Sequence, residues 1–277
     1  MEETDLINLE YLSILELNGK GSFELLQGQI TADMGKVVDN ECVMGAMCDI
    51  KGRVISSFLV TKNPKEDGGY FLIGEKEVMI LTKDLLQKYQ PFYDVSLSIQ
   101  DHYKFFAIKE SFLLKEYPGT KLNQSFQDYG DFWRVHFLKK KFHIIATTES
   151  DKLQNYHASE NIDPWILDEI NNLNFEVSAS TISKFTPHEL GYHITPRVDF
   201  EKGCYTGQEI VARMHYRAKK LPRMLIKSSN DKKEILSKVL DDDKKVIGLV
   251  LLTAKEDKKN VNLLSMNKNF SEQLFKF

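Results

Sequence analysis

The feature that most constrains the fold is a series of short strand-like runs and single helical segments without the strand–helix–strand rhythm of a parallel sheet. Turn residues such as Asn18-Gly19 and Asn63-Pro64 end these runs. The expected strands are 12–17, 41–48, 54–60, 70–73, 95–99, 105–108, 132–138 and 142–146. The expected helices are 22–27, capped by Ser22 and stopped at Gly28, 75–89, 150–159 and a short one near Trp165. A loop containing Pro118-Gly119 is expected between the strands at 105–108 and 132–138. The pattern predicts an α+β protein.

The C-terminal part of the chain has a different pattern. Apolar bursts at 246–252 and 261–264 are separated by charged turns such as 241–245. Short strands divided by polar turns are typical of a small β domain.

Composition narrows the function classes. The 277 residues carry a net charge of −3, so nucleic-acid contact would require a local basic patch. The acidic N-terminal stretch does not resemble a secretory signal, and no apolar run approaches the roughly 20 residues that span a bilayer. The three cysteines, Cys42, Cys48 and Cys204, are sparse and lack zinc-ligand spacing. We expect a cytoplasmic protein without a structural metal or a membrane contact.

The most informative segment is 200–217. Thr206 and Glu209 have the spacing of a capping box, which predicts a helix starting just after Thr206, with Ile210, Val211 and Met214 on its buried face. Cys204 then precedes the positive end of a helix dipole.

Cys204 has further neighbours that bear on its chemistry. Lys202 lies two residues upstream, and Gly203 and Gly207 permit tight turns. Positive potential beside a thiol is the condition that lowers the pKa of a cysteine. We therefore interpret Cys204 as a reactive or ligand-forming thiol; the alternative is a small buried apolar residue.

A basic stretch continues beyond this segment. Residues 202–223 hold one acidic residue, Glu209, and six cations: Lys202, Arg213, Arg217, Lys219, Lys220 and Arg223. Aromatic side chains, Tyr205 and Tyr216 among them, are interleaved. Such a stretch suits phosphate contact and base stacking, or an acidic ligand tail. The alternative is a solvated helix face.

Three segments together resemble one known family. The run 202–209, KGCYTGQE, resembles the K-G-C-Y-x-G-Q-E signature of the YgfZ proteins, and Ala212-Arg213 and Tyr216-Arg217 continue the match. The run 26–33 is similar to the family's L-Q-G-Q-x-T-x-D, and 48–53 to its C-D-x-K-G-[KR]. The signature residues Lys202, Gly203, Cys204, Tyr205, Gly207, Gln208, Glu209, Arg213 and Arg217 are our candidate site residues, with Cys204 and Lys202 as the reactive pair.

The resemblance implies a fold like that of the glycine-cleavage aminomethyltransferase (T-protein), with a folate channel and a small C-terminal β-barrel. We expect residues 1–100 together with 161–215 to form a discontinuous folate-binding domain, 101–160 an inserted ferredoxin-like α+β domain, and 216–277 the barrel. The resemblance also implies that the cofactor is tetrahydrofolate, or its 5-formyl or 5,10-methylene form. The resemblance also implies iron–sulfur enzymes that modify tRNA as partners. The basic stretch described above suggests direct tRNA contact through 213–223.

The transfer of single residues is uneven. Trp165 resembles a family tryptophan that contacts folate, whereas Tyr11 stands near the position of a second tryptophan that is absent here. Trp165 as a core aromatic is the alternative. Where the aminomethyltransferase has an acidic pair, this chain has Ser56-Ser57, and serine is no base at neutral pH.

The leading interpretation is a folate-binding accessory factor in tRNA modification and iron–sulfur assembly, without ordinary turnover. The alternatives are a folate-dependent aminomethyl transferase, an RNA-binding adaptor, and a thiol redox protein. The serine pair disfavours the aminomethyl transferase, and the net charge of −3 disfavours the RNA-binding adaptor. The lack of a second cysteine near Cys204 in the sequence disfavours the thiol redox protein.

Overall fold

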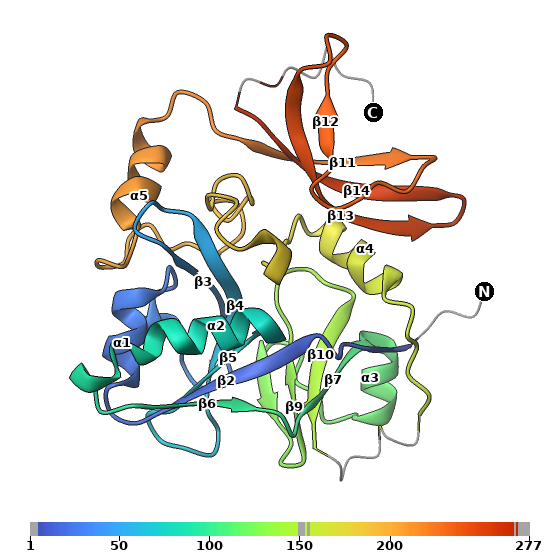
Figure 1. Ribbon diagram of the computed structural model, residues 1–277. Helices are drawn as coiled ribbons and strands as arrows, with labels where there is room; N and C mark the ends of the chain where they lie inside the picture. Colours follow the sequence, from blue (N-terminus) through green and yellow to red (C-terminus); the bar gives the residue numbers. More distant parts are fainter. Residues whose placement is uncertain (1–4, 149–152, 154–155, 269, 271–277) are drawn as a thin grey trace.

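The computed structural model describes residues 5–148, 153, 156–268 and 270, which form three antiparallel sheets (Figure 1). The first sheet has the order β3 (Cys42–Cys48), β4 (Val54–Lys62), β5 (Tyr70–Glu75), β2 (Leu12–Asn18), β6 (Ser96–Gln100). The second has the order β1 (Leu6–Asn8), β7 (Lys104–Lys109), β10 (Phe142–Thr147), β9 (Phe132–Val135), β8 (Phe126–Asp128). The third has the order β11 (Arg223–Ser229), β14 (Lys259–Met266), β13 (Val246–Glu256), β12 (Lys238–Leu240).

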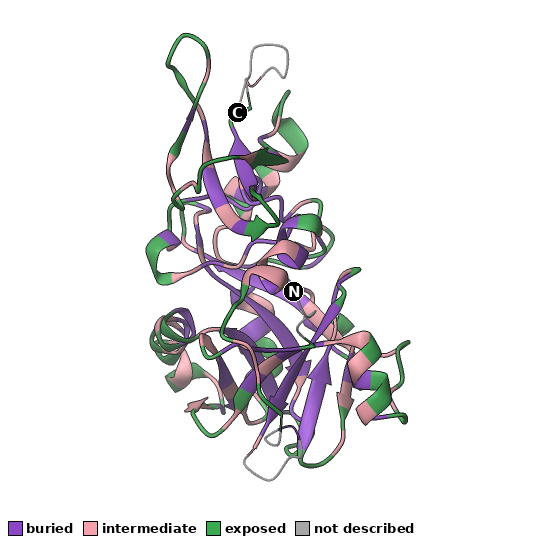
Figure 2. Cartoon of the chain, turned by 90° about the vertical axis from the view of Figure 1, so that its right-hand side faces the viewer, coloured by how far each residue is buried: buried purple, intermediate pink, exposed green. Residues whose placement is uncertain are grey.

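The first sheet is covered by helices on one face and by the second sheet on the other. Its central strands β4 and β5 are therefore buried almost throughout, whereas the edge strand β6 is partly exposed. Alternate residues of a strand point to opposite faces. In β2, Leu15 and Leu17 join the core that includes α2 (Lys76–Gln87) and α1 (Ser22–Gln29), whereas Ile14 joins the core shared with the second sheet. The outer face of the second sheet packs against α3 (Glu110–Glu116) through Leu113. Figure 2 shows these buried strands between helices whose outer sides are exposed.

Two further helices connect the sheets. Helix α4 (Asp163–Asn171) packs against β13 and β14 of the C-terminal sheet, and its Trp165 joins the core between the first two sheets. Helix α5 (Gln208–Arg217) lies on the other side of the molecule, beyond β3 and β4 (Figure 1). The expected α+β class with a small C-terminal β region is confirmed.

Several boundaries differ from the predicted ones. Gly21, not Ser22, caps α1, and Gly28 lies inside the helix, which ends at Gln29. Pro118-Gly119 does lie in a loop, but the expected loop between 108 and 132 also holds α3 before it and β8 after it. Half of the expected helix at 150–159 lies outside the described residues. The described residues 156–159 are not helical, and Ser159 forms an isolated bridge with Ile7. Strand β1 was not predicted from the sequence, and it pairs with β7 at the edge of the second sheet.

Candidate functional site

The three segments that carry the family resemblance meet in space. Gly207 caps α5 in the left-handed conformation, at φ +83°, against the 49–52 turn of the β3–β4 hairpin. A Cβ on Gly207 would lie 2.3 Å from the Asp49 carbonyl oxygen. The Thr206 hydroxyl donates to Oε1 of Gln29 at the end of α1, over 3.0 Å. Segments far apart in the sequence therefore build one surface, and only glycine fits where the signature meets the hairpin.

The predicted capping box is wrong. The helix does begin just after Thr206, but no side chain caps it, and the Thr206 hydroxyl bonds to Gln29 instead. A residue at φ +83° moves the Thr206 hydroxyl away from the first amides of the helix. Of the predicted buried face, Val211 is buried, whereas Ile210 and Met214 are half-buried.

Lys202 is a structural neighbour of α1 rather than an exposed cation. Its Nζ donates to the carbonyl oxygens of Gln27 and Ile30, each over 2.7 Å, and lies 5.2 Å from the Tyr205 ring centroid. Burial lowers the pKa of Lys202 to about 8. The ammonium satisfies carbonyls at the end of the helix, as cations near helix C-termini do. Cys204, two residues later, is exposed.

A second cluster lies where α4 and the following segment meet the first sheet. The buried Arg197 pairs with Glu176 and also donates to Asn174 Oδ1 and to the Gly45 and Phe58 carbonyls, each over 3.1 Å. Ser57 of β4 donates to Glu176 Oε2 over 2.8 Å and accepts from the Val177 amide over 2.7 Å. The Glu176 side chain keeps 23% of its surface exposed, so this oriented residue remains partly accessible.

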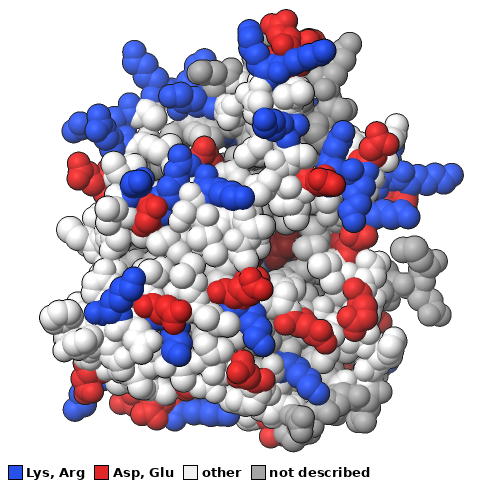
Figure 3. All heavy atoms as spheres, viewed as in Figure 1, with Lys and Arg blue, Asp and Glu red and all other residues white. Residues whose placement is uncertain are grey.

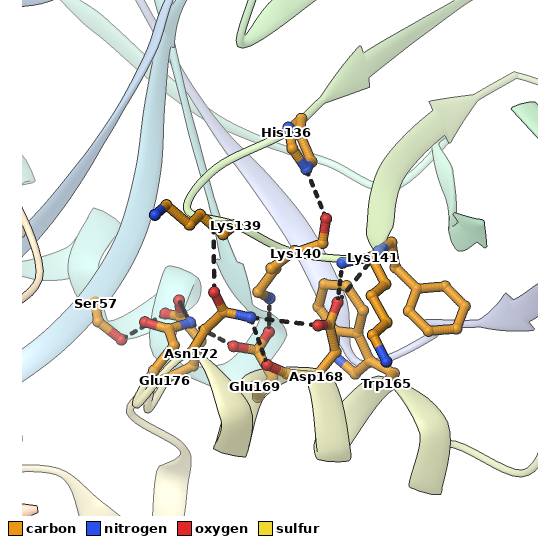
Figure 4. A network of polar contacts seen from close by, with 12 residues as sticks. Ser57, His136, Lys139, Lys140, Lys141, Trp165, Asp168, Glu169, Asn172 and Glu176 are labelled. Carbon is orange, nitrogen blue, oxygen red and sulfur yellow. Dashed lines mark hydrogen bonds and ion pairs between the residues drawn. The ribbon is translucent and has the colours of Figure 1, made fainter. Parts of the chain in front are cut away.

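The same cluster extends into the second sheet through the loop between β9 and β10 (Figure 4). Lys140 pairs with the buried Glu169, whose other oxygen accepts from Asn174 over 2.5 Å. Burial raises the pKa of Glu169 and lowers that of Lys140. Asp168 accepts from the amides of Lys141 and Phe142, over 2.8 and 3.1 Å, and so fixes the loop to α4.

The structure brings together the two residues predicted to contact folate. Trp165 Nε1 donates to the Tyr11 hydroxyl over 2.8 Å, and Lys140 Nζ lies 3.8 Å from the Trp165 ring centroid. Burial raises the pKa of the Tyr11 phenol. Trp165 is only 2% exposed and packs against Tyr11 and Lys140. The contact of the two rings with folate stays a prediction.

A cavity of about 640 Å³ adjoins this cluster. Its wall includes Met44, next to Gly45, and Leu138, two residues before Lys140. His136, also in the wall, donates through Nε2 to the Lys140 carbonyl over 3.0 Å. The remaining lining comes from the residues after α1, from the start of β3, from residues 122–125 and 137, and from the 196–201 segment, which leads into the signature. The lining includes chain neighbours of both clusters, but not Glu176, Arg197, Lys202 or Cys204 themselves. The volume is that of a small-molecule site.

Sequence reasoning missed the residues at the centre of this site: Asn174, Glu176 and Arg197. One signal was available, because 173–177 alternates apolar and polar residues and so places Asn174 and Glu176 on one side of an extended segment. Arg197 had no such signal, since its partners are backbone carbonyls of distant strands.

Among the described residues, no group of three or more His, Cys, Asp and Glu side chains is arranged to hold a metal ion. In the same part of the chain, no helix has the length and apolarity that crossing a membrane requires.

The fold defines the class of protein. The glycine cleavage system aminomethyltransferase T of Bartonella henselae superposes with a TM-score of 0.72, over 94% of this chain and 77% of that chain, at 11% identity. The chain is a mixed helix-and-sheet protein with the aminomethyltransferase T fold.

Sequence comparison narrows the class further. The chain is 28% identical over 233 residues to tRNA-modifying protein YgfZ of Colwellia psychrerythraea, covering 79% of this chain and 70% of that protein. It is 26% identical over 230 residues to the protein of the same name from Escherichia fergusonii, covering 76% and 68%. No protein-family model matches the chain. The chain is thus similar to the YgfZ proteins over most of its length, and the resemblance seen in its motifs is confirmed.

The glycine pair of the signature offers a matched test of this packing. We expect Gly207→Ala to lower the free energy of unfolding by about 2–4 kcal/mol, because φ is positive and the new Cβ meets the Asp49 carbonyl. Gly203→Ala is the control, since nothing lies within 4 Å of a Cβ there. Urea unfolding followed by circular dichroism measures both, and equal effects would contradict the packing described.

Three histidines lie together at α5, which itself carries His215. His188 is fully buried, with ring centroids 5.0 Å from His193 and 5.9 Å from His215. Neither of its ring nitrogens has a hydrogen-bond partner among the described residues. Burial lowers the pKa of His188 to about 4.

This pKa predicts acid sensitivity. In the unfolded chain the His188 imidazole has the ordinary histidine pKa near 6.5. Between about pH 6.5 and 4 the unfolded state therefore binds more protons at this residue than the folded state does. The free energy of unfolding should therefore fall over that window, by up to about 3 kcal/mol for His188. His188→Phe should flatten this slope and exposed His157→Phe should not, in urea unfolding at several pH values. An unchanged slope in His188→Phe would contradict the assignment.

Proposed function

We propose that the protein is a folate-binding accessory factor in tRNA modification that supports iron–sulfur enzymes, with Cys204 as its working thiol. The relatives are named tRNA-modifying proteins, which supports the tRNA role. The observation that carries the folate part is the partly exposed Glu176 carboxylate, held by Arg197 and Ser57.

The chemistry of a reduced pterin matches this carboxylate. The ring presents a ring N–H and an amino group side by side, and a fixed carboxylate accepts such a pair through both oxygens. Arg197 and Ser57 keep the Glu176 carboxylate oriented, so that little conformational freedom is lost on binding. A cavity of about 640 Å³, lined by the chain neighbours of Gly45 and Arg197 but not by Glu176 itself, has the volume of a small-molecule site.

The same geometry favours a binding role over aminomethyl transfer. Ser57 stands where the transferase family has an acidic group, and its hydroxyl is already engaged with Glu176 and the Val177 amide. A hydroxyl held in this way cannot accept a proton from a donor amine at neutral pH. This supports folate as a bound effector or carrier in this protein.

Calorimetric titration with tetrahydrofolate and with its 5-formyl form tests the folate proposal. We expect Glu176→Gln to weaken binding at least tenfold, because one charge-assisted acceptor is lost. Ser57→Ala should weaken it several-fold through the freed Glu176. Trp165→Phe tests whether the tryptophan contributes.

The neighbouring serine provides the control. Ser56 is also buried, but its hydroxyl has no hydrogen-bond partner among the described residues, so Ser56→Ala should bind folate like the wild type. Each variant is first checked for cooperative unfolding. Absence of binding to the wild type, or equal binding by all variants, would contradict a folate site at Glu176.

The exposed thiol gives a separate test. Cys204 is exposed, whereas burial raises the pKa of Cys48 to about 12 and also raises that of Cys42. Iodoacetamide should therefore alkylate Cys204 first, as followed by mass spectrometry of peptides. In cells, Cys204→Ser should lower the content of thiolated nucleosides in tRNA. Unchanged nucleosides would contradict the proposed role of the thiol.

A further inference from the structure

Helix α5 carries an outer face that has no partner within the described part of the chain. Val211 points into the core, while Arg213 and Arg217 are exposed one helical turn apart and so share a face. Three more exposed cations follow at Lys219, Lys220 and Arg223. Figure 3 shows basic side chains gathered at the upper left, over α5 and the segment that follows it.

These five cations are unneutralised. Elsewhere on the surface Lys36 pairs with Asp199 and Lys62 with Asp39. Among the described residues, none of the five forms an ion pair, and Glu209 is the one acidic residue in 202–223. In a chain of net charge −3, this is a local positive field that suits a ligand with several negative groups.

An exposed aromatic ring is held within this field. Tyr216 is 67% exposed, and its ring is fixed edge-on against Phe200 and His215, with centroids 6.3 and 4.9 Å away. Phe200 and His215 are themselves stacked at 3.7 Å. A ring that is held from behind and open in front is a platform for a planar group, as in proteins that bind single-stranded nucleic acid.

Two hollows lie along this stretch, and the Tyr216 ring lines the first of them. One, of about 540 Å³, is lined by Gln208, Glu209, Ala212, Arg213, Tyr216 and Arg217. The other, of about 640 Å³, includes Lys219, Lys220, Arg223 and Lys268. The cations thus line two successive hollows along the chain rather than one small pocket, which suits an extended polyanion.

We infer that the surface formed by Arg213, Tyr216, Arg217, Lys219, Lys220 and Arg223 binds unpaired RNA. The guanidinium groups contact successive phosphates, because their planar fork matches phosphate geometry, and Tyr216 stacks on a base. An acidic protein segment would satisfy the charges but would leave the exposed ring unused. The inference rests on the proposed role in tRNA modification and names the surface through which RNA is held.

Fluorescence anisotropy with a labelled 15-nucleotide single-stranded RNA and an unmodified tRNA transcript tests it, over a range of salt concentrations. Arg213→Gln/Arg217→Gln should weaken binding about tenfold or more and reduce the salt slope by about 1.4, since two phosphate contacts are lost at ~0.7 each. Tyr216→Ala should weaken binding about tenfold with the salt slope unchanged, and Tyr216→Phe should keep it.

The matched control is Lys258→Gln/Lys259→Gln, which changes the net charge equally in the β13–β14 turn on the opposite side of the molecule (Figure 1). It should bind RNA like the wild type. Equal weakening by this control, or wild-type affinity in the α5 variants, would overturn the inference. So would displacement of RNA by polyglutamate at equal charge combined with no effect of Tyr216→Ala, which would indicate an acidic protein partner. Folate titration of the same variants reports on the Glu176 site separately, so the two ideas can fail independently.

Discussion

The structure depends on the buried guanidinium of Arg197. Its donors reach the carbonyls of Gly45 and Phe58 on neighbouring strands and the side chains of Asn174 and Glu176, and so join the first sheet to the segment that follows α4. Its own carbonyl accepts from the Thr31 hydroxyl over 2.6 Å. Removing one partner of a buried charged pair typically costs about 3–5 kcal/mol, because the other charge stays buried. The Arg197 guanidinium therefore both joins the sheet to the segment after α4 and orients the Glu176 carboxylate of the candidate site.

Around this anchor, each polar cluster has a different degree of exposure. Glu169 and Lys140 are closed off beneath the Trp165 ring and compensate each other, whereas Glu176 is fixed on one side and open on the other. Lys202 is turned inward to the end of α1, and Cys204 outward. The signature segment thus combines an inward structural cation and an outward thiol within three residues. This division explains how one short motif can both hold the fold and face a partner.

The sequence allowed most of the fold to be predicted, because the strands and α2 carry strong apolar periodicity over their own length. It failed where the determinant was distant. The helix after Thr206 was expected from a local capping pattern, yet its start is set by Gly207 packing on the 49–52 turn. Strand β1 is too short to show periodicity and is defined by its pairing with β7. At the site, Trp165 and Tyr11 were identified from resemblance, but Glu176 and Arg197 depend on contacts across more than a hundred residues.

The pairing of β1 with β7 also has a consequence for biosynthesis. Leu6 lies opposite Ile108, Ile7 also bridges to Ser159, and Tyr11 meets Trp165, so the first strand has no complete partner until some 160 residues have been made. Contacts this far apart in the chain slow folding, and a growing chain leaves the early strand exposed in the meantime. The end of α1 waits still longer, for Lys202. The segment around Cys204 is therefore the last of these elements to be synthesised, and its Lys202 holds the end of α1, the first helix of the described chain.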